Sequence, residues 1–310
     1  MDVFSREHGA TMVARLLVIV LGVALLVLNV PGAGALSGAK FGMGALAALA
    51  CNQLALLLTA TRLQRILHIF ALPTRWRDVL WIHLQSMFYF FFVPMTVGLE
   101  LSRFAKLKRL HPSAAGTAIA GVVLLDRVIG VAGALLFSLA LLPLVTLGGG
   151  ERVGFSWAML GVAVAAGSTL AGGVVAWPRS RRQLYAVWLL LAPRWRHLFP
   201  AAVLTLASQA AFALAAQQGA SAFGIVIGFV PVLFGLSAAM LFIIVPVSFA
   251  GAGPAEAACA AIFSMLGLAP RAALIVSGIV YSLRLFAALQ GGLVEIGGDL
   301  RGLRRLYFKP

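Results

Sequence analysis

The segment VPMTVGLELSRFAKLKRL (Val93–Leu110) interrupts a long apolar run, and a similar segment, VPVSFAGAGPAEAACAAIFSML (Val245–Leu266), interrupts another. In each, a Val-Pro pair ends the apolar run, small or hydroxylated residues follow, and a glutamate lies at the start of a new short helix. A proline-containing loop comes next, and then a long apolar stretch with an arginine near its middle. A pattern that occurs twice at matching distances predicts an internal repeat, and in membrane transporters such repeats surround the binding site.

The overall composition excludes a water-soluble protein. Hydrophobic residues make up 62% of the 310 residues, only 11% are charged, and the mean hydropathy is +1.01. A soluble surface requires more polar side chains than this, whereas apolar runs of about 20 residues cross the roughly 30 Å hydrocarbon core as helices. The sequence therefore predicts an all-α polytopic membrane protein that forms a single transmembrane domain over residues 1–310.

The expected topology has six full spans and two re-entrant hairpins. The spans are expected at Leu16–Val30, Phe41–Ala60, Ser113–Leu142, Phe155–Trp177, Phe199–Gln218 and Arg271–Ile296. The hairpins are expected at Val79–Leu110 and Phe223–Leu266, with hinge residues at Pro94, Gly98, Pro246, Gly251 and Gly253. Two spans, a hairpin and a span then form repeat 1, about residues 1–142, and the same order recurs with inverted topology in repeat 2, about residues 155–297.

The distribution of basic residues orients this topology. Most of the 24 lysines and arginines lie in the first 15 residues, in the connectors at 61–77 and 179–196, between Arg103 and Arg109, and in the tail. The positive-inside rule then places these segments and both termini in the cytoplasm. Because residues on both sides of the run Val79–Val97 would be cytoplasmic, that run has to turn back within the membrane. Eight full transmembrane helices are the alternative, and the first apolar run also has the form of a signal peptide.

The net charge of +15 does not indicate nucleic-acid binding, because the basic residues lie in short loops and form no platform with aromatic residues. The GAGPAE sequence at 251–256 lacks the last glycine and the preceding strand of a nucleotide-binding loop. We expect no metal or cofactor, since the histidines show no ligand spacing, and we expect them to pack at the membrane interface. These histidines are His68, His83, His111 and His197.

Three charged residues, Asp126, Arg127 and Arg284, fall near the middle of predicted spans, where a charge is costly. They form either ion pairs that hold helices together or a polar cleft that binds a charged headgroup. The recurrence of the arginine in both repeats favours the cleft, since arginine is suited to bidentate phosphate binding. Neighbouring residues on a helix point about 100° apart, so Asp126 requires a partner on another helix or a ligand.

Two glutamates, Glu100 and Glu256, each lie in the first helical turn after a break. They either complement the helix dipole or titrate and bind a cationic group in the cleft. Arg103 lies three residues after Glu100 on the same helix face, so we expect these two side chains to couple. Thr96 and Ser248 lie within the breaks, where they either satisfy freed backbone groups or contact substrate.

These motifs resemble those of the flippase-like family, also described as the lysylphosphatidylglycerol synthase transmembrane region. The family's first motif, in which proline, glycine, an acidic residue and arginine follow one another, is similar to Pro94, Gly98, Glu100 and Arg103, with Leu99 as one extra residue. Its acidic–arginine pair is similar to Asp126-Arg127. Its second motif is similar to Pro246, Ser248, Gly251, Gly253 and Glu256, and this chain has Ala255 where members often carry arginine.

The resemblance implies a lipid flippase-like domain of the bacterial cytoplasmic membrane. In the best-known members this region moves aminoacylated phosphatidylglycerol between leaflets, and stand-alone relatives are associated with hopanoid, glycolipid or polyprenyl-linked pathways. Nothing in the 310 residues resembles the soluble aminoacyl-transferase domain of the large members, so we do not expect this chain to aminoacylate lipids. The implied partners are lipids with anionic or zwitterionic headgroups, together with enzymes of lipid biosynthesis.

The functional prediction is a lipid transporter rather than an enzyme. The predicted substrate-binding residues are Thr96, Glu100, Arg103, Asp126, Arg127, Ser248, Glu256 and Arg284. A membrane-embedded lipid-modifying enzyme is the alternative, with the same buried carboxylates as acid and base, but no nucleophile–base arrangement stands out. A scaffold of a lipid-synthesis complex is the third possibility.

Overall fold

The computed structural model describes residues 38–92, 97–147, 195–241 and 254–307, which form eight helices and no strand. In chain order these are α2 (Gly38–Ile69), α3 (Trp76–Phe92), α4 (Val97–Leu110), α5 (Gly116–Leu147), α8 (Trp195–Ala222), α9 (Phe229–Leu241), α10 (Pro254–Met265) and α11 (Pro270–Tyr307). Four of them contain stretches long and apolar enough to cross a membrane, namely Gly42–Ile69, Gly116–Val145, Leu198–Ala222 and Pro270–Glu295. The chain is therefore an all-α, multi-pass membrane protein, as its composition predicts.

These four stretches correspond to four of the six predicted spans. The other two predicted spans, Leu16–Val30 and Phe155–Trp177, lie outside the described residues. The same is true of most residues predicted for the two breaks, which are Pro94, Thr96, Pro246, Ser248, Gly251 and Gly253. Gly98, predicted as part of the first break, is instead a buried residue in the first turn of α4.

The shorter helices form two hairpins, α3 with α4 and α9 with α10. At 1.5 Å per residue, the 14-residue α4 and the 12-residue α10 are roughly 21 and 18 Å long, which is less than the thickness of the hydrocarbon core. A 2.9 Å hydrogen bond joins Thr74 Oγ1, just before α3, to His111 Nε2, just after α4. The first hairpin therefore begins and ends at the same end of the molecule.

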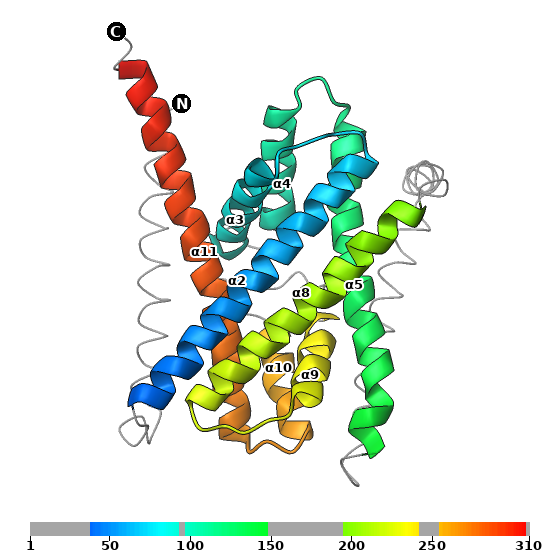
Figure 1. The fold of residues 1–310 in the computed structure, drawn as a ribbon, viewed down its shortest axis with the longest axis vertical. Helices are drawn as coiled ribbons and strands as arrows, with labels where there is room; N and C mark the ends of the chain where they lie inside the picture. The colour runs from blue at the N-terminus through cyan, green and yellow to red at the C-terminus, as the bar shows by residue number, and fades with distance from the viewer. Residues whose placement is uncertain (1–37, 93–96, 148–194, 242–253, 308–310) are drawn as a thin grey trace.

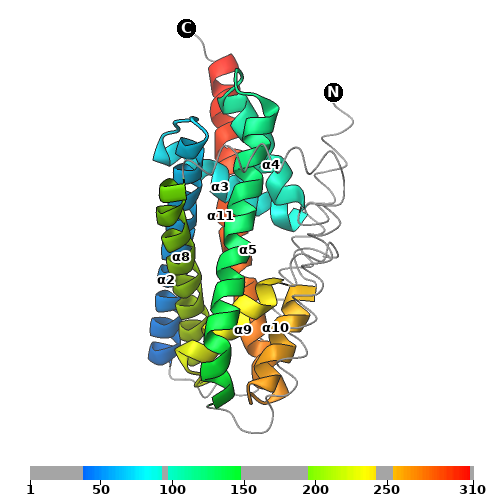
Figure 2. The ribbon, with the colours of Figure 1, turned by 90° about the vertical axis from the view of Figure 1, so that its right-hand side faces the viewer.

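The two hairpins lie in opposite halves of the molecule. Figure 1 shows α3 and α4 in the upper half and α9 and α10 in the lower half, and Figure 2 shows the same separation from the side. Each hairpin packs against the long helix that follows the other one, since α3 contacts α11 and α9 contacts α5. The contact between α3 and α11 is so close that a Cβ on Gly291 would lie 1.9 Å from the carbonyl oxygen of Leu84.

Helices α2 and α8 run side by side in opposite directions across the molecule (Figure 1). Gly44 near the start of α2 contacts Ala222 at the end of α8, where an added Cβ would lie 2.8 Å from the Ala222 Cβ. Buried alanines continue the contact between the two helices. Small residues allow close approach of helix backbones, which is how transmembrane helices gain van der Waals contact when lipid is as apolar as their side chains.

Two apolar cores hold these helices together. The upper core joins the end of α2 to α3, α4 and the start of α5, through residues such as Leu67, Val79 and Leu107. The lower core joins the end of α5 to α8, α9, α10 and the start of α11, through residues such as Phe234 and Phe263. The middle of the bundle, between these cores, contains the polar side chains described below.

The end of α2 corrects one prediction. The sequence predicts a cytoplasmic connector at 61–77, but α2 continues without interruption to Ile69. The reason is that Leu63, Ile66 and Leu67 repeat at helical spacing and are fully buried in the upper core. Arg62 is therefore a buried residue of a membrane-spanning helix rather than a cytoplasmic loop residue.

Candidate functional site

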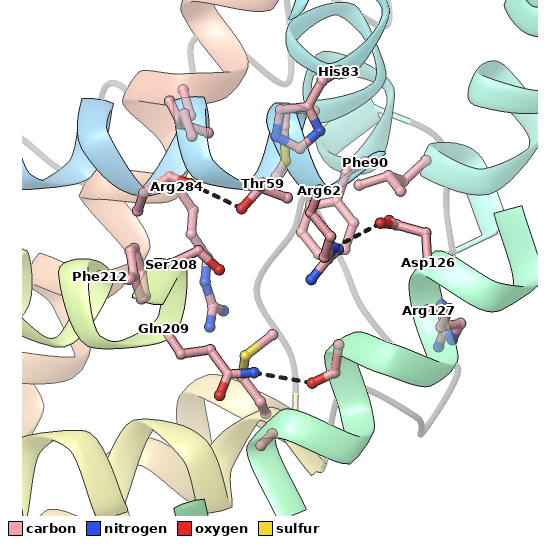
Figure 3. A pocket seen from close by; sticks show the side chains of 18 of the residues that line it. Thr59, Arg62, His83, Phe90, Asp126, Arg127, Ser208, Gln209, Phe212 and Arg284 are labelled. Carbon is pink, nitrogen blue, oxygen red and sulfur yellow. Dashed lines mark hydrogen bonds and ion pairs between the residues drawn. The ribbon is translucent and has the colours of Figure 1, made fainter. Parts of the chain in front are cut away.

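A cavity of about 290 Å³ lies in the middle of the bundle, and α2, α3, α4, α5, α8, α9 and α11 all contribute to its wall. Six charged residues line it: Arg62, Glu100, Arg103, Asp126, Arg127 and Arg284. Neutral polar groups are also present, and Figure 3 shows Thr59, His83, Ser208 and Gln209 around the same space. A concentration of charge at this depth is costly in a membrane protein and marks a candidate functional site.

Asp126 on α5 is the centre of a buried charged cluster. Its Oδ1 accepts a hydrogen bond from Arg62 Nε at 2.8 Å, and its Oδ2 accepts one from Arg103 Nη1 at 2.6 Å. The three side chains come from α2, α4 and α5 and are all buried. The prediction that Asp126 needs a partner on another helix is confirmed, and it has two. Removal of Asp126 would leave two buried guanidiniums without a counter-charge, which is unfavourable because buried ions are expensive to desolvate.

His83 on α3 extends this cluster. Its Nδ1 lies 3.0 Å from Arg103 Nη2. A guanidinium nitrogen can only donate, so Nδ1 accepts and the imidazole proton is on Nε2. His83 Nε2 and Arg103 Nε are both buried, and neither has a hydrogen-bond partner among the described residues. The prediction that His83 packs at the membrane interface is wrong, because the side chain is 1% exposed and lies beside Arg103.

Two further ion pairs occur in matching places. Glu100 in the first turn of α4 pairs with Arg127 on α5, and Glu256 in the first turn of α10 pairs with Arg284 on α11 at 2.8 Å. Each pair joins the second helix of a hairpin to the long helix that follows it. The predicted coupling of Glu100 to Arg103 is wrong, since each residue has its partner on another helix.

The environments of the two pairs differ in exposure. The side chains of Arg127 and Glu100 are 33% and 23% exposed, whereas those of Arg284 and Glu256 are 17% and 16% exposed. The guanidinium of Arg284 also lies 5.8 Å from the ring centroid of Phe212, within cation–π distance. Arg284 is thus held more firmly than Arg127.

Most of the predicted site residues come together in this structure. Five of them line the cavity: Glu100, Arg103, Asp126, Arg127 and Arg284. Glu256 is connected to the cavity through Arg284, while Thr96 and Ser248 lie outside the described residues. Within the described ranges there is also no group of three or more His, Cys, Asp or Glu residues that could hold a metal ion.

Sequence reasoning missed several polar residues of the cavity, among them Arg62, His83 and Gln209. The predicted topology places Arg62 in a connector, although the first proline after Ala60 is Pro73 and no glycine lies between them. The signal that could have identified Arg62 is the helical spacing of the apolar residues that follow it. His83 and Gln209 carried no comparable signal, because each is a single polar residue in a long apolar run. Gln209 Nε2 donates to the carbonyl oxygen of Gly130 at 3.0 Å.

A polar contact outside the cavity ties the first hairpin to α11. Lys106 Nζ lies 2.7 Å from Glu295 Oε2, and Tyr89 donates a 3.0 Å hydrogen bond to Glu295 Oε1. Lys106 also lies 5.6 Å from the centroid of the Tyr89 ring. This contact joins α3, α4 and α11 close to the place where Gly291 allows α3 and α11 to touch.

The sequence was compared with known proteins. A family model described as the lysylphosphatidylglycerol synthase TM region matches residues 12–291, which include every charged residue of the cavity. No curated protein and no solved structure gives a match to this chain.

Proposed function

Because the chain belongs to the lysylphosphatidylglycerol synthase TM-region family, we propose that it moves a lipid with a charged headgroup across the bacterial cytoplasmic membrane. The observation that carries this proposal is the cavity, which brings four arginines together inside the bundle, three of them on helices long and apolar enough to cross a membrane. A phospholipid, a hopanoid, a glycolipid or a polyprenyl-linked lipid are the candidate substrates.

The proposed topology consists of two inverted repeats with six spans, two re-entrant hairpins and both termini in the cytoplasm. Three arrangements support it. The order helix, hairpin, helix occurs in α2–α5 and again in α8–α11. Helices α2 and α8 run antiparallel, and the two hairpins lie in opposite halves (Figure 1). Each hairpin also packs on the long helix that follows the other hairpin.

In the proposed mechanism only the polar headgroup enters the cavity, while the hydrocarbon tails stay in the bilayer. The idealised cost of moving an ion of carboxylate size into a medium of low dielectric constant is of order 20 kcal/mol. Arginines fixed inside the bundle lower this cost, because their guanidinium groups form charge-assisted, bidentate hydrogen bonds to phosphate oxygens.

The two matched ion pairs give this mechanism a way to alternate access. Each glutamate is on a hairpin and each arginine is on a long helix, so a headgroup that takes the place of Glu100 or Glu256 releases that hairpin from its helix. Motion of one half against the other around a fixed central site then exposes the cavity to either leaflet in turn.

The test is a leaflet-exchange assay on purified protein in liposomes, with the variants Arg127→Ala and Arg284→Ala. Both variants should fold and lose exchange, because each removes a guanidinium that meets the headgroup. Arg271→Ala is the matched control, since Arg271 is an exposed arginine at the start of α11. Wild-type exchange in Arg127→Ala and Arg284→Ala would contradict the proposed roles.

The lipid-modifying enzyme remains the alternative function. It would need a carboxylate that exchanges protons with substrate, but Asp126, Glu100 and Glu256 each accept a hydrogen bond from at least one arginine. This arrangement favours binding over acid–base chemistry. Mass spectrometry of lipids incubated with the purified protein would detect altered lipid chemistry if the alternative were correct.

A further inference from the structure

We propose that the cavity selects headgroups with one net negative charge, and that the phosphodiester of such a headgroup binds at Arg62, Arg103 and His83. This inference rests on the proposed lipid transport and names its substrate class. It also assigns the central binding role to a cluster in which two of the three residues, Arg62 and His83, are not apparent from the sequence motifs.

The first argument is the charge of the site. The described residues that line the cavity include four arginines, and the carboxylates paired with them are Asp126, Glu100 and Glu256. Each of Arg127 and Arg284 has a carboxylate of its own, so these two pairs are neutral. Arg62 and Arg103 share Asp126, and His83 is neutral because its Nδ1 accepts a hydrogen bond. One positive charge is left at the cluster.

The sequence shows that the nearby breaks do not supply the missing counter-charge. Residues 93–96 and 242–253, which fall between the helices of the two hairpins, contain no ionisable side chain. An uncompensated charge in a desolvated site is strongly unfavourable. A ligand with one negative charge therefore neutralises the site. A neutral ligand leaves the site with a net charge of about +1, and a dianion gives it a net charge of about −1.

The second argument is the hydrogen bonding of the cluster. Arg103 Nε and His83 Nε2 are both donors, both are buried, and both lack a partner among the described residues. Buried donors in native structures are nearly always satisfied. Both residues line the cavity, so an anion with several acceptor oxygens can satisfy them without breaking the bonds to Asp126. A phosphodiester has two such unesterified oxygens and carries one negative charge.

The space beside Arg62 is also suitable. Gly130 on α5 faces this guanidinium, and a Cβ added there would lie 3.6 Å from Arg62 Nη1. Thr205 Oγ1 is 3.4 Å from the same nitrogen, so the known partner of Arg62 Nη1 is a long contact. Nη1 is therefore the nitrogen of Arg62 for which a ligand would compete with Thr205, while Nε stays with Asp126.

The test is a binding panel on the purified wild-type protein in detergent, with dihexanoyl lipids as probes. Dihexanoyl phosphatidylglycerol is the monoanionic diester, dihexanoyl phosphatidylethanolamine the zwitterionic diester and dihexanoyl phosphatidic acid the monoester. The monoanionic diester should bind at least about tenfold more tightly than the zwitterion. This factor corresponds to about one third of the attraction between unit charges 4 Å apart at a dielectric constant of about 20. Equal binding of these two, or tighter binding of the monoester, would overturn the proposal.

Two further arms separate this proposal from the transport proposal. Dimethyl phosphate, a water-soluble monoanionic diester, should compete with the lipid but bind more weakly. If dimethyl phosphate competes but the wild-type protein does not accelerate phosphatidylglycerol exchange over protein-free liposomes, the charge selection stands and lipid transport is contradicted. If liposome exchange occurs but does not distinguish phosphatidylglycerol from phosphatidylethanolamine, transport stands and the charge selection is overturned.

The variant Arg62→Gln removes the one excess charge and leaves Asp126 paired with Arg103. It should reduce the tenfold preference for phosphatidylglycerol to less than about twofold. Arg271→Gln removes an exposed arginine outside the cavity and should keep the full preference. A full preference in folded Arg62→Gln would overturn the assignment of this cluster, and the wild-type panel decides the question if that variant does not fold.

Discussion

The two hairpins carry the same ion pair but differ in the residues around it. Three residues after Glu100 is Arg103, and three residues after Glu256 is Cys259. One residue before Arg127 is Asp126, and one residue before Arg284 is Leu283. All four of these flanking residues are buried, at 2–5% exposure. The first half therefore has a charged pair where the second half has an apolar one.

The two halves therefore share one ion pair and differ in a second. The glutamate–arginine pair is present in both halves, where it holds each hairpin to its long helix and, in the proposed mechanism, opens when the headgroup arrives. The Arg103–Asp126 pair is present only in the first half, where it recruits Arg62 and His83. If the two halves form the proposed inverted repeat, a charged cluster in one half only is expected when one ligand binds away from the axis of that repeat.

Removal of the central carboxylate should give the largest effect. Asp126→Leu introduces leucine, the residue that precedes Arg284 in the second half. It leaves the buried guanidiniums of Arg62 and Arg103 without a counter-charge. We expect a loss of about 3–5 kcal/mol in the free energy of unfolding, measured by denaturation in detergent.

The triple variant Arg62→Met, Arg103→Met, Asp126→Leu removes the whole charged cluster. Its stability should return to within about 2 kcal/mol of wild type, because apolar replacement of a complete buried ionic group is often nearly neutral. Leaflet exchange by this triple variant should be absent. A triple variant less stable than Asp126→Leu alone would contradict this account of the cluster.

The glycine contact between α3 and α11 should be nearly as sensitive. Gly291, seven residues after Arg284, lies against the backbone of Leu84, whereas Ala134, seven residues after Arg127, already has a Cβ. Gly291→Ala should cost about 3 kcal/mol, the upper end for overpacking, because a backbone carbonyl cannot move aside easily.

The matched substitution is Ala134→Gly, which removes a Cβ from the corresponding position of α5. It should cost only about 1 kcal/mol, mainly through helix propensity. Thermal unfolding of both variants in detergent compares the two contacts, and equal losses would show that the approach of α3 to α11 is not closer than that of α9 to α5.

The two ion pairs should differ when their glutamates are neutralised. Glu256→Gln should cost about 2 kcal/mol, between the values for exposed and fully buried pairs, and Glu100→Gln about 1 kcal/mol. The reason is that the Glu256–Arg284 pair is about half as exposed as the Glu100–Arg127 pair. Chemical denaturation of both variants measures the difference, and a larger loss for Glu100→Gln would contradict it.

A small effect on stability, with none on exchange, is expected at the Lys106–Glu295–Tyr89 contact outside the cavity. Tyr89→Phe removes the 3.0 Å hydrogen bond to Glu295 but leaves Lys106 in place. The loss should be about 1 kcal/mol, with leaflet exchange retained, as measured in the same unfolding and liposome assays. Six residues after Glu256, the position that corresponds to Lys106 is the buried Ile262, so the second half lacks this tie. Loss of exchange in Tyr89→Phe would give the tie a role in transport.

Much of the fold could be predicted because the helices depend on local features of the sequence, namely the length of each apolar run and the Val-Pro breaks within two of them. The four described spans follow from hydropathy. The first hairpin follows from a Val-Pro break with basic stretches before and after it, and the second from the recurrence of the Val-Pro break. The recurrence of glutamate and arginine at matching distances also identified both members of the Glu100–Arg127 and Glu256–Arg284 pairs, although not which residues pair.

The pairing could not be predicted because it depends on tertiary contacts. Arg103 and Glu100 share a helix face, which favours coupling in an isolated helix, but α5 offers each of them a partner of opposite charge. Arg62 was missed for a related reason, since a basic residue at the end of an apolar run is typical of a cytoplasmic loop. Only the packing of Leu63 and Leu67 in the upper core places Arg62 inside the bundle.

The most direct test of the central claim is the rate of phosphatidylglycerol exchange between leaflets in liposomes that contain the purified protein. Wild type and the Arg271→Ala control should accelerate exchange equally over protein-free liposomes, and the folded triple variant that lacks the Arg62–Arg103–Asp126 cluster should not accelerate it. Wild-type exchange by that triple variant would contradict the claim that this cavity carries the headgroup.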